Sequence, residues 1–392
     1  MLKHKVLLST DIGSDIDDAL ALLVMLNHPA FDINGIYTVN GNVDARSYIA
    51  HHMIKLSGKH IPVARGESQA LDSRIRPYYF FEDCLVDDSY INHEESSCSP
   101  EIAFKRVEDV GILSNGVDDL VARLKKEKCS VISIAPATNI AKALEQSADA
   151  ATNIERIYIM GCRFSEADAR EHNVRYDLAA MARVLESKTP ITIIPGNVCE
   201  QYRMPTSMLE RLKSPAGQYV RKMARGFLAA KTAQAFGTSI IEGLNLKTIL
   251  EELVLHKSPA GLDAMNENER LEWVKRSELV TNLDDPYFGA LDQEGYFRQY
   301  QKLIDHINDP RLQCSFASIL THKLESLTPK TLSVSDVYVP YCIAHPEKVK
   351  TKKMKVICNL EGKSLGLPNG NHEVVQDLDF DDFKEFLKIY LK

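Results

Sequence analysis

Short apolar runs alternate with helical patterns along the first half of the chain. The run Lys5–Thr10 (KVLLST) is short and apolar, which predicts a buried strand, and residues 17–27 after it predict a helix. Residues 117–126 carry apolar side chains at positions i, i+3, i+4 and i+7, the spacing of one helix face. The other elements predicted in this half are strands at 33–42, 130–135, 156–161 and 190–195, and helices at 46–58, at 139–146 with Asn139 as N-cap, and at 177–187.

This alternation is typical of an α/β protein with an open, mostly parallel, doubly wound sheet. Ligands of such sheets bind at the carboxyl ends of the strands. We therefore expect the functional residues to follow the strands directly.

The second half has a different pattern. Residues 201–332 are mostly helical, with the clearest helical patterns at 217–236 and 315–326, and no strand is predicted between 200 and 330. The end of the chain is mixed: strands predicted at 353–360 and 372–378 flank the turn-rich GLPNGN, and a helix is expected at 379–391. The pattern predicts one α/β domain over residues 1–392, with residues 201–332 as a helical insertion.

Composition narrows the range of functions and partners that the chain can have. The 392 residues are 44% hydrophobic, and the net charge of −7 argues against binding to nucleic acid or to an anionic membrane surface. The basic cluster KVKTKK (348–353) is interpreted as a solvated loop. Eight cysteines without CxxC spacing predict reduced, buried thiols, and no apolar stretch approaches 18 residues. We expect a cytoplasmic protein without a signal peptide or a membrane span.

The segment STDIGSDIDDALAL (9–22) is the most informative motif, because it places Asp11, Asp15, Asp17 and Asp18 within eight residues. A helix start explains Asp17 and Asp18, with Asp15 as the cap. It does not explain Asp11, which follows a buried strand directly. Carboxylates without nearby His or Cys favour Ca²⁺ or Mg²⁺. An EF-hand does not fit the spacing, whereas a phosphatase-type site with Asp11 as nucleophile remains an alternative.

The same segment resembles the N-terminal signature of the inosine–uridine-type nucleoside hydrolases. Further segments resemble this family in the family's order: TVNGNVD (38–44), APATNIAKAL (135–144), IYIMGCRF (157–164) with EHNVRYDLAA (171–180), and the stretch that begins SDVYVPYC at Ser335. The resemblance covers 9–200 and 333–391, and residues 201–332 are longer than their family counterpart.

The resemblance implies a Ca²⁺-dependent N-ribohydrolase that acts on a small riboside as a homodimer or homotetramer. It implies a metal site formed by Asp11, Asp18, Asp336 and the Thr138 carbonyl, with Asp15 supporting it. Asp11 is then the general base, which activates water. The residues expected to bind the riboside are Asp17, Asn42, Glu171, Asn173 and His172.

Three positions depart from the family pattern: Ser9 replaces Asp, His172 replaces Phe, and Ser335 stands where many members have His. A serine cannot protonate a leaving base near neutral pH. We therefore expect an unusual or modified base, or an acid supplied by the insertion, which we place near the base pocket. His172 is either a proton donor or a structural residue.

Four further readings remain open. The pair Asp284–Asp285 competes with Asp336 for the last metal position, and aromatics of the insertion could stack on a base: Trp273, Tyr287, Phe288 and Tyr296. The rival functions are a metal-dependent phosphoester hydrolase and a non-catalytic riboside-binding protein.

Overall fold

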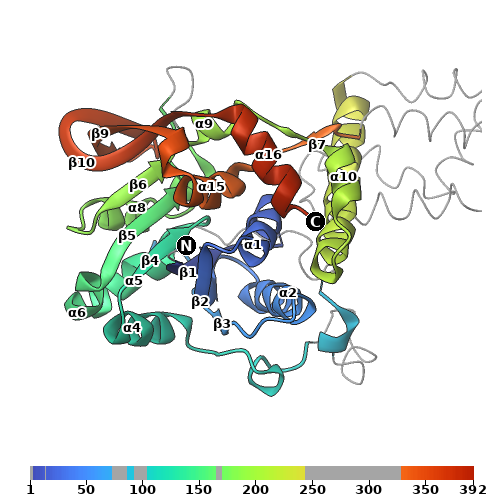
Figure 1. Ribbon diagram of the computed structural model, residues 1–392, viewed down its shortest axis with the longest axis horizontal. Helices are drawn as coiled ribbons and strands as arrows, with labels where there is room; N and C mark the ends of the chain where they lie inside the picture. Colours follow the sequence, from blue (N-terminus) through green and yellow to red (C-terminus); the bar gives the residue numbers. More distant parts are fainter. Residues whose placement is uncertain (1–2, 14, 73–85, 92–103, 165–169, 243–327) are drawn as a thin grey trace, which may run out of the picture. The chain divides into compact units, whose positions relative to one another are not determined.

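The structure, a computed structural model, describes residues 3–13, 15–72, 86–91, 104–164, 170–242 and 328–392 (Figure 1). The chain divides into two compact units, one formed by Met1–Ala224 with Thr331–Lys392 and the other by Arg225–Lys330. The competing pair Asp284–Asp285, the four insertion aromatics and the helix predicted at 315–326 lie outside the described residues.

The first unit is built on an eight-stranded sheet in the order β3-β2-β1-β4-β5-β6-β10-β9. Every neighbouring pair is parallel except β9 and β10, which form an antiparallel hairpin at one edge. The strands are β1 (His4–Thr10), β2 (Phe31–Thr38), β3 (Val63–Arg65), β4 (Cys129–Ser133), β5 (Ile154–Met160), β6 (Ile191–Ile194), β9 (Val349–Cys358) and β10 (Ser364–Leu378). The predicted α/β fold with a mostly parallel sheet is confirmed.

Helices cover the sheet on both faces (Figure 1). The α-helices in the described part of the chain are α1 (Asp17–Asn27), α2 (Val43–Leu56), α4 (Gly116–Lys126), α5 (Thr138–Gln146), α6 (Ala148–Thr152), α7 (His172–Tyr176), α8 (Leu178–Leu185), α9 (Gly196–Cys199), α10 (Pro215–Glu242), α15 (Tyr338–Ala344) and α16 (Phe380–Tyr390), and α10 extends from the first unit into the second. Helices α15 and α16 contact α1 from outside, which explains why almost every residue of α1 is buried.

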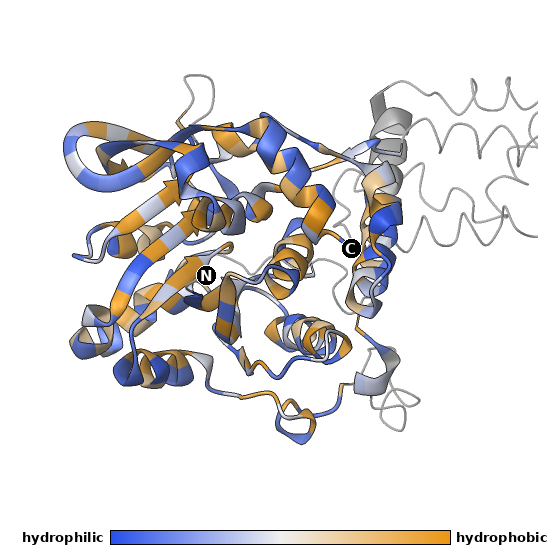
Figure 2. Ribbon diagram, viewed as in Figure 1, coloured by the Kyte–Doolittle hydropathy of each residue, from blue (hydrophilic) through white to orange (hydrophobic). Residues whose placement is uncertain are grey.

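One core lies between the sheet and the layer formed by α4, α5 and α8. Alternate strand residues such as Leu7, Val131 and Ile157 enter it, and Leu120 and Ile140 meet them from the helices. Each buried side chain of this size contributes roughly 1.5–3 kcal/mol to folding. The hydropathy colouring of Figure 2 shows the outcome: apolar residues concentrate on strands and inner helix faces, and polar ones on the outer turns.

The predicted cap of α5 is wrong. The helix begins at Thr138 with Ala137 at the N-cap. The fully buried Asn139 side chain instead donates to the Thr38 carbonyl at 3.1 Å and accepts from the Glu67 amide at 3.0 Å. These contacts tie the ends of neighbouring strands together, which satisfies a buried amide better than a cap position would.

Three expectations about the second half also need correction. A short strand β7 (Met204–Pro205) does occur after residue 200, paired with β8 (Thr331–Leu332). The turn-rich GLPNGN lies within β10 as a bulge, because the hairpin turns at 359–363 instead. The basic cluster 348–353 lies largely in β9, where its lysines protect the exposed edge of the sheet.

Among the described residues, no helix combines the length and the apolar character needed to cross a membrane.

Candidate active site

The predicted site residues follow the strands at one edge of the sheet. Strand β1 ends at Thr10, directly before Asp11, and β4 ends five residues before Thr138. These two strands are neighbours, while β2 continues the sheet on one side and β5 on the other. Their carboxyl ends therefore form the switch point at which α/β sheets bind ligands.

Three aspartates meet at this edge. Asp17 and Asp18 come from the first turn of α1, and Asp336 comes from the short 3-10 helix η7 (Ser335–Val337), which packs against α1. One carboxylate oxygen from each lies within 4.8 Å of the others, and all three side chains are buried. The Thr10 hydroxyl donates to Asp18 Oδ1 at 2.5 Å.

The electrostatics of this group favour a cation. Burial, together with the charge of Asp15, raises the pKa of Asp17 to about 8. Burial and the charges of neighbouring aspartates raise the pKa of Asp18 and of Asp336 well above the ordinary range. The charge of Asp11 contributes to all three shifts, although the group with oxygens within 4.8 Å of one another comprises only Asp17, Asp18 and Asp336. A divalent ion with oxygen ligands fits this donor set, because it offsets the mutual repulsion of the carboxylates.

Asp11 is held from two sides by residues that the sequence analysis missed. The amide of Asn40 donates to Asp11 Oδ2 at 3.3 Å. The guanidinium of Arg46, which is fully buried, donates to the Asp11 carbonyl and to the Ile12 carbonyl. The sequence feature that could have revealed Arg46 is its helical spacing: it lies one turn before the apolar Ile49, which predicts a charged side chain on the buried face of α2.

Thr138 is also fixed through its side chain. Its hydroxyl donates to Asp177 Oδ2 at 2.6 Å, and the same oxygen accepts the Leu71 amide at 2.8 Å. Asp177 is fully buried and caps α8 by accepting from the Ala180 amide. One carboxylate therefore connects the start of α5, the start of α8 and the segment after β3.

Glu171 and Asn173 are buried beyond the end of β5. The Glu171 carboxylate accepts the amides of Asn173 and Val174 and thereby caps α7, while burial raises its pKa. Asn173 donates its side-chain amide to the Met160 carbonyl at 3.3 Å. The buried Cys199 thiol donates to the Ser335 carbonyl at 3.7 Å, and burial, together with charges that include those of Asp336, Asp17 and Glu171, raises its pKa. The charges of Glu171 and of two of the aspartates therefore act on the same buried thiol.

The remaining predicted residues are more exposed than the three aspartates. Asn42 caps α2 by accepting from the Ala45 amide at 3.0 Å. Asp15 is exposed, and α1 has Ile16 rather than Asp15 at its N-cap. Ser335 bonds the Ser333 hydroxyl at 2.8 Å, and His172 is exposed beside Glu171.

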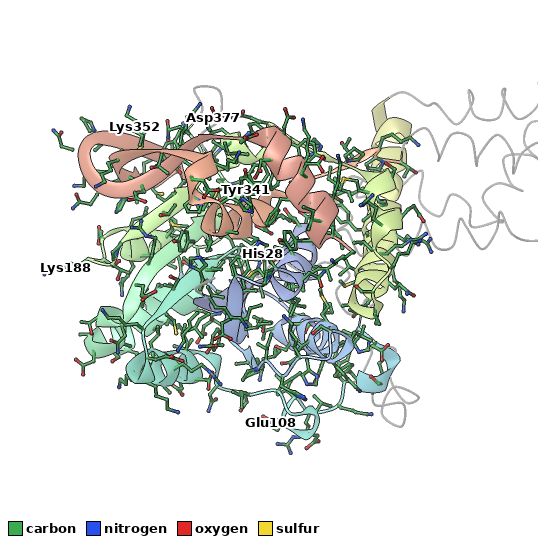
Figure 3. The ribbon with its side chains drawn as sticks, in the orientation of Figure 1. His28, Glu108, Lys188, Tyr341, Lys352 and Asp377 are labelled. Carbon is green, nitrogen blue, oxygen red and sulfur yellow. The ribbon has the colours of Figure 1, made fainter. Side chains whose placement is uncertain are left out.

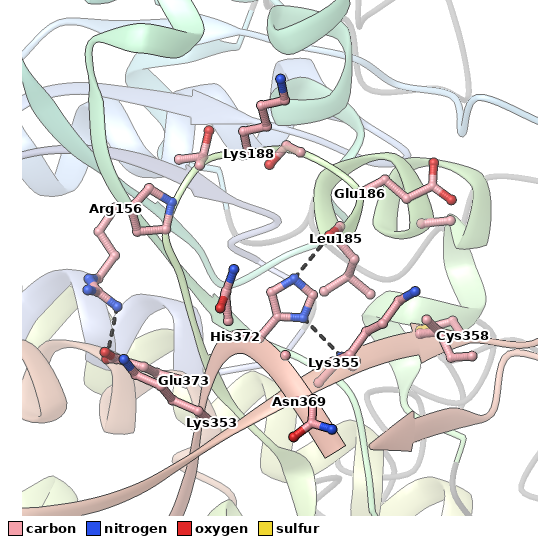
Figure 4. A pocket seen from close by; sticks show the side chains of 18 residues that line it. Arg156, Leu185, Glu186, Lys188, Lys353, Lys355, Cys358, Asn369, His372 and Glu373 are labelled. Atoms are coloured by element: carbon pink, nitrogen blue, oxygen red, sulfur yellow. Dashed lines mark hydrogen bonds and ion pairs between the residues drawn. The ribbon is translucent and has the colours of Figure 1, made fainter. Parts of the chain in front are cut away.

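A separate hollow of about 840 Å³ lies near the opposite end of β6 (Figure 4). The His372 ring accepts from the Val356 amide and bonds the Leu185 carbonyl, each at 3.0 Å. Two carboxylates line the hollow, Glu186 and Glu373, and Glu373 is paired with Arg156 at 2.9 Å. His372 is thus bonded to the backbone and Glu373 to Arg156, which contrasts with the like-charged carboxylates at the other edge.

Comparison with known proteins agrees with this geometry. A family model described as "Inosine-uridine preferring nucleoside hydrolase" matches residues 6–385. The probable uridine nucleosidase 2 of Arabidopsis thaliana is 27% identical over 236 residues, which cover 57% of this chain and 68% of that protein. The non-specific ribonucleoside hydrolase RihC of Salmonella paratyphi A is 28% identical over 214 residues, 53% of this chain and 66% of its own length. The matched regions therefore span about two thirds of these relatives.

Solved structures extend the similarity in fold to nearly the whole chain. The purine-preferring ribonucleoside hydrolase from Gardnerella vaginalis superposes with a TM-score of 0.57 at 17% identity, covering 99% of this chain and 98% of that one. A plant nucleoside hydrolase superposes with a TM-score of 0.58 at 16% identity, with the same coverage. With the family model matching nearly its full length, the chain belongs to the inosine-uridine preferring nucleoside hydrolase family of N-glycosyl hydrolases.

Proposed function

We propose that this chain is a Ca²⁺-dependent ribohydrolase, which converts a ribonucleoside and water into ribose and free base. The observation that carries the proposal is the buried group of Asp17, Asp18 and Asp336 at the carboxyl edge of the sheet. An uncompensated cluster of this kind is costly to bury, and oxygen ligands suit Ca²⁺. Asp11, Asp18, Asp336 and the Thr138 carbonyl would hold the ion, with Asp15 supporting from the exposed side. The bound ion supplies charge compensation and acidifies a water molecule.

The protein's own groups then bind and orient the substrate. Asp11 accepts the proton of the attacking water as general base. Asp17 accepts a hydrogen bond from the ribose 2′-hydroxyl, and Asn42, Glu171 and Asn173 orient the other hydroxyls. Holding the sugar and water in one geometry lowers the barrier by several kcal/mol. The burial of Glu171 and Asn173 beyond the carboxyl end of β5, which belongs to the same sheet edge, supports these roles.

The leaving base is the part of the reaction in which this chain departs from its family. Ser335 bonds Ser333, and a hydroxyl pair of this kind is no acid near neutral pH. We propose that the substrate carries a base that departs with little protonation, such as a modified or electron-poor base. His172 would contact the riboside at its exposed position beside Glu171.

The activity is tested with a panel of ribosides scored by reducing-sugar release. We expect sugar release that disappears with a chelator, returns with Ca²⁺, and falls at least about 100-fold in Asp11→Ala. Asp149→Asn changes an exposed carboxylate on α6 and serves as the matched control. Phosphate release from phosphoesters without sugar release, or tight riboside binding without turnover, would overturn the proposal in favour of its two rivals.

A second panel tests the leaving group. Ribosides of equal sugar and decreasing leaving-group pKa, up to p-nitrophenyl riboside, should show a steep rise in kcat as the pKa falls. Equal kcat across the panel would show that an acid protonates the base, contrary to the proposal.

The remaining features extend the same proposal. Residues 201–332 would form an insertion near the base pocket, the enzyme would act as a homodimer or homotetramer, and it would work in the cytoplasm. Ligand-dependent protection of that segment in hydrogen exchange, and the mass in solution, test the first two points.

A further inference from the structure

The proposed general base, Asp11, has to present its carboxylate in one orientation. Contacts from two neighbouring residues hold it in that orientation. Asp11 lies in the loop between β1 and α1, outside both elements, and this loop includes Gly13 at φ 112°. Such a loop needs outside contacts to hold a single conformation.

Arg46, near the start of α2, supplies these contacts. Its Nη1 donates to the carbonyls of Asp11 and Ile12, and its Nε donates to the Asn40 carbonyl at 2.7 Å. One guanidinium, fully buried at the start of α2, therefore joins the loop after β1 to the loop after β2. The planar fork of arginine can serve both loops at once, which the single ammonium of lysine cannot do.

Asn40 completes the arrangement from the second loop. Its backbone is left-handed at φ 69°, a conformation that asparagine tolerates better than most residues. In this conformation the buried side-chain amide reaches Asp11 Oδ2. Arg46 therefore holds Asn40 and the Asp11 peptide, and Asn40 holds one oxygen of the Asp11 carboxylate.

We propose that Arg46 and Asn40 are positioning residues that fix the Asp11 carboxylate, so that Oδ2 is held by the protein and Oδ1 faces the reaction. The proposal rests on the proposed function for the role of Asp11. The orientation itself is a property of these loops. It also affects ion binding, because Asp11 is one of the proposed ligands.

Asn40→Gly is the sharpest test, because glycine keeps the left-handed backbone and removes only the amide. We expect kcat to fall about 10- to 100-fold, KM to change less than about 3-fold, and Ca²⁺ affinity by calorimetry to weaken about 10-fold. Asn369→Gly is the matched control, since Asn369 is also left-handed (φ 59°) but lies in the β10 bulge. It should leave all three quantities unchanged.

Arg46→Lys keeps the charge and removes the fork. We expect it to reproduce the losses of Asn40→Gly, whereas Arg123→Lys, at a half-buried arginine that binds Asp119 and the Asn34 carbonyl, should not. Wild-type kcat and Ca²⁺ affinity in both site variants would overturn the proposal, as would a change in KM alone. If the wild type releases no ribose from any riboside, the proposed function fails, but calorimetry of the same variants still decides the positioning role.

Discussion

At the scale of single residues, the main energetic feature of the site is the burial of several like charges in one place. Asp17, Asp18 and Asp336 are buried in one place, although carboxylates repel one another and lose hydration there. Thr10 and the backbone amides of Asp17 and Ser335 offset part of this cost. The proposed divalent ion would remove most of the remaining repulsion, so that binding of the ion and stability of the fold would be linked.

Asp336→Asn tests this linkage. The change removes one of the repelling carboxylates and one proposed ligand, while the shape of the side chain is kept. We expect the Tm of the metal-free chain to stay equal or rise, and the rise in Tm on adding Ca²⁺ to shrink by at least half. Differential scanning calorimetry with chelator and with Ca²⁺ measures both. A metal-free variant clearly less stable than the wild type would contradict a repulsive cluster.

The residues of the site differ in how visible they are in the sequence. Asp17, Asp18 and Asp336 could be predicted because they belong to motifs, and the structure brings them together. Arg46 and Asn40 could not, because their partners are backbone carbonyls and an aspartate about 30 residues away. Contacts of this kind depend on the fold and leave no local pattern.

At the scale of elements, the predictable parts are those with a strong period and a buried face. Strand β1 and helix α1 were predicted to within a residue, since an apolar run and its following helix define them locally. The two-residue strands β7 and β8 were missed, because they exist only through pairing with each other across more than 120 residues. The β10 bulge was taken for a turn, because its Pro, Asn and Gly residues suit both structures.

Gly370→Ala tests the bulge of β10. A Cβ at this position would lie 1.9 Å from the Lys355 backbone nitrogen and 2.2 Å from its Cα, so the paired strands would have to separate. We expect a loss of about 2–4 kcal/mol of stability, seen as a lower Tm and a lower midpoint in urea. Asn371→Ala, at an exposed neighbouring position, should change stability by less than about 0.5 kcal/mol. Equal Tm values for the two variants would show that the bulge is not closely packed.

At the scale of the whole first unit, the C-terminal helix α16 packs against the first helix, α1. The Asn27 side chain at the end of α1 donates to the Tyr390 carbonyl at the end of α16. Around this joint, the ring centroid of His28, which is labelled in Figure 3, lies 4.2 Å from that of Tyr390 and 5.6 Å from that of Phe386. The joint lies at the C-terminal end of α1, and the first turn of the same helix carries Asp17 and Asp18. Contacts that stabilise the joint therefore also hold the helix that carries the site.

This joint should make the fold sensitive to acid. The His28 imidazole is 5% exposed, and its Nδ1 accepts from the Ala30 amide at 3.1 Å. Burial, and then the charges of His345 and His4, lower its pKa from 6.5 to about 4. His345 in turn lies 3.4 Å from Asp382 on α16. Because the unfolded chain binds the proton first, stability falls as the pH drops from about 6.5 to 4, by at most about 3 kcal/mol for this group.

His28→Asn removes the titration and keeps an acceptor for the Ala30 amide. Its stability at pH 7 is expected to be lower, since the ring contacts are lost, but its further loss between pH 7 and pH 4.5 should be smaller than that of the wild type by about 1–3 kcal/mol. Urea midpoints at pH 7, 6, 5 and 4.5 measure the two slopes. His60→Asn, at an exposed histidine, should keep the wild-type slope. Parallel slopes for His28→Asn and the wild type would show that His28 gains its proton as easily in the folded chain as in the unfolded one. Acid sensitivity would then have to arise elsewhere than at the joint between α1 and α16.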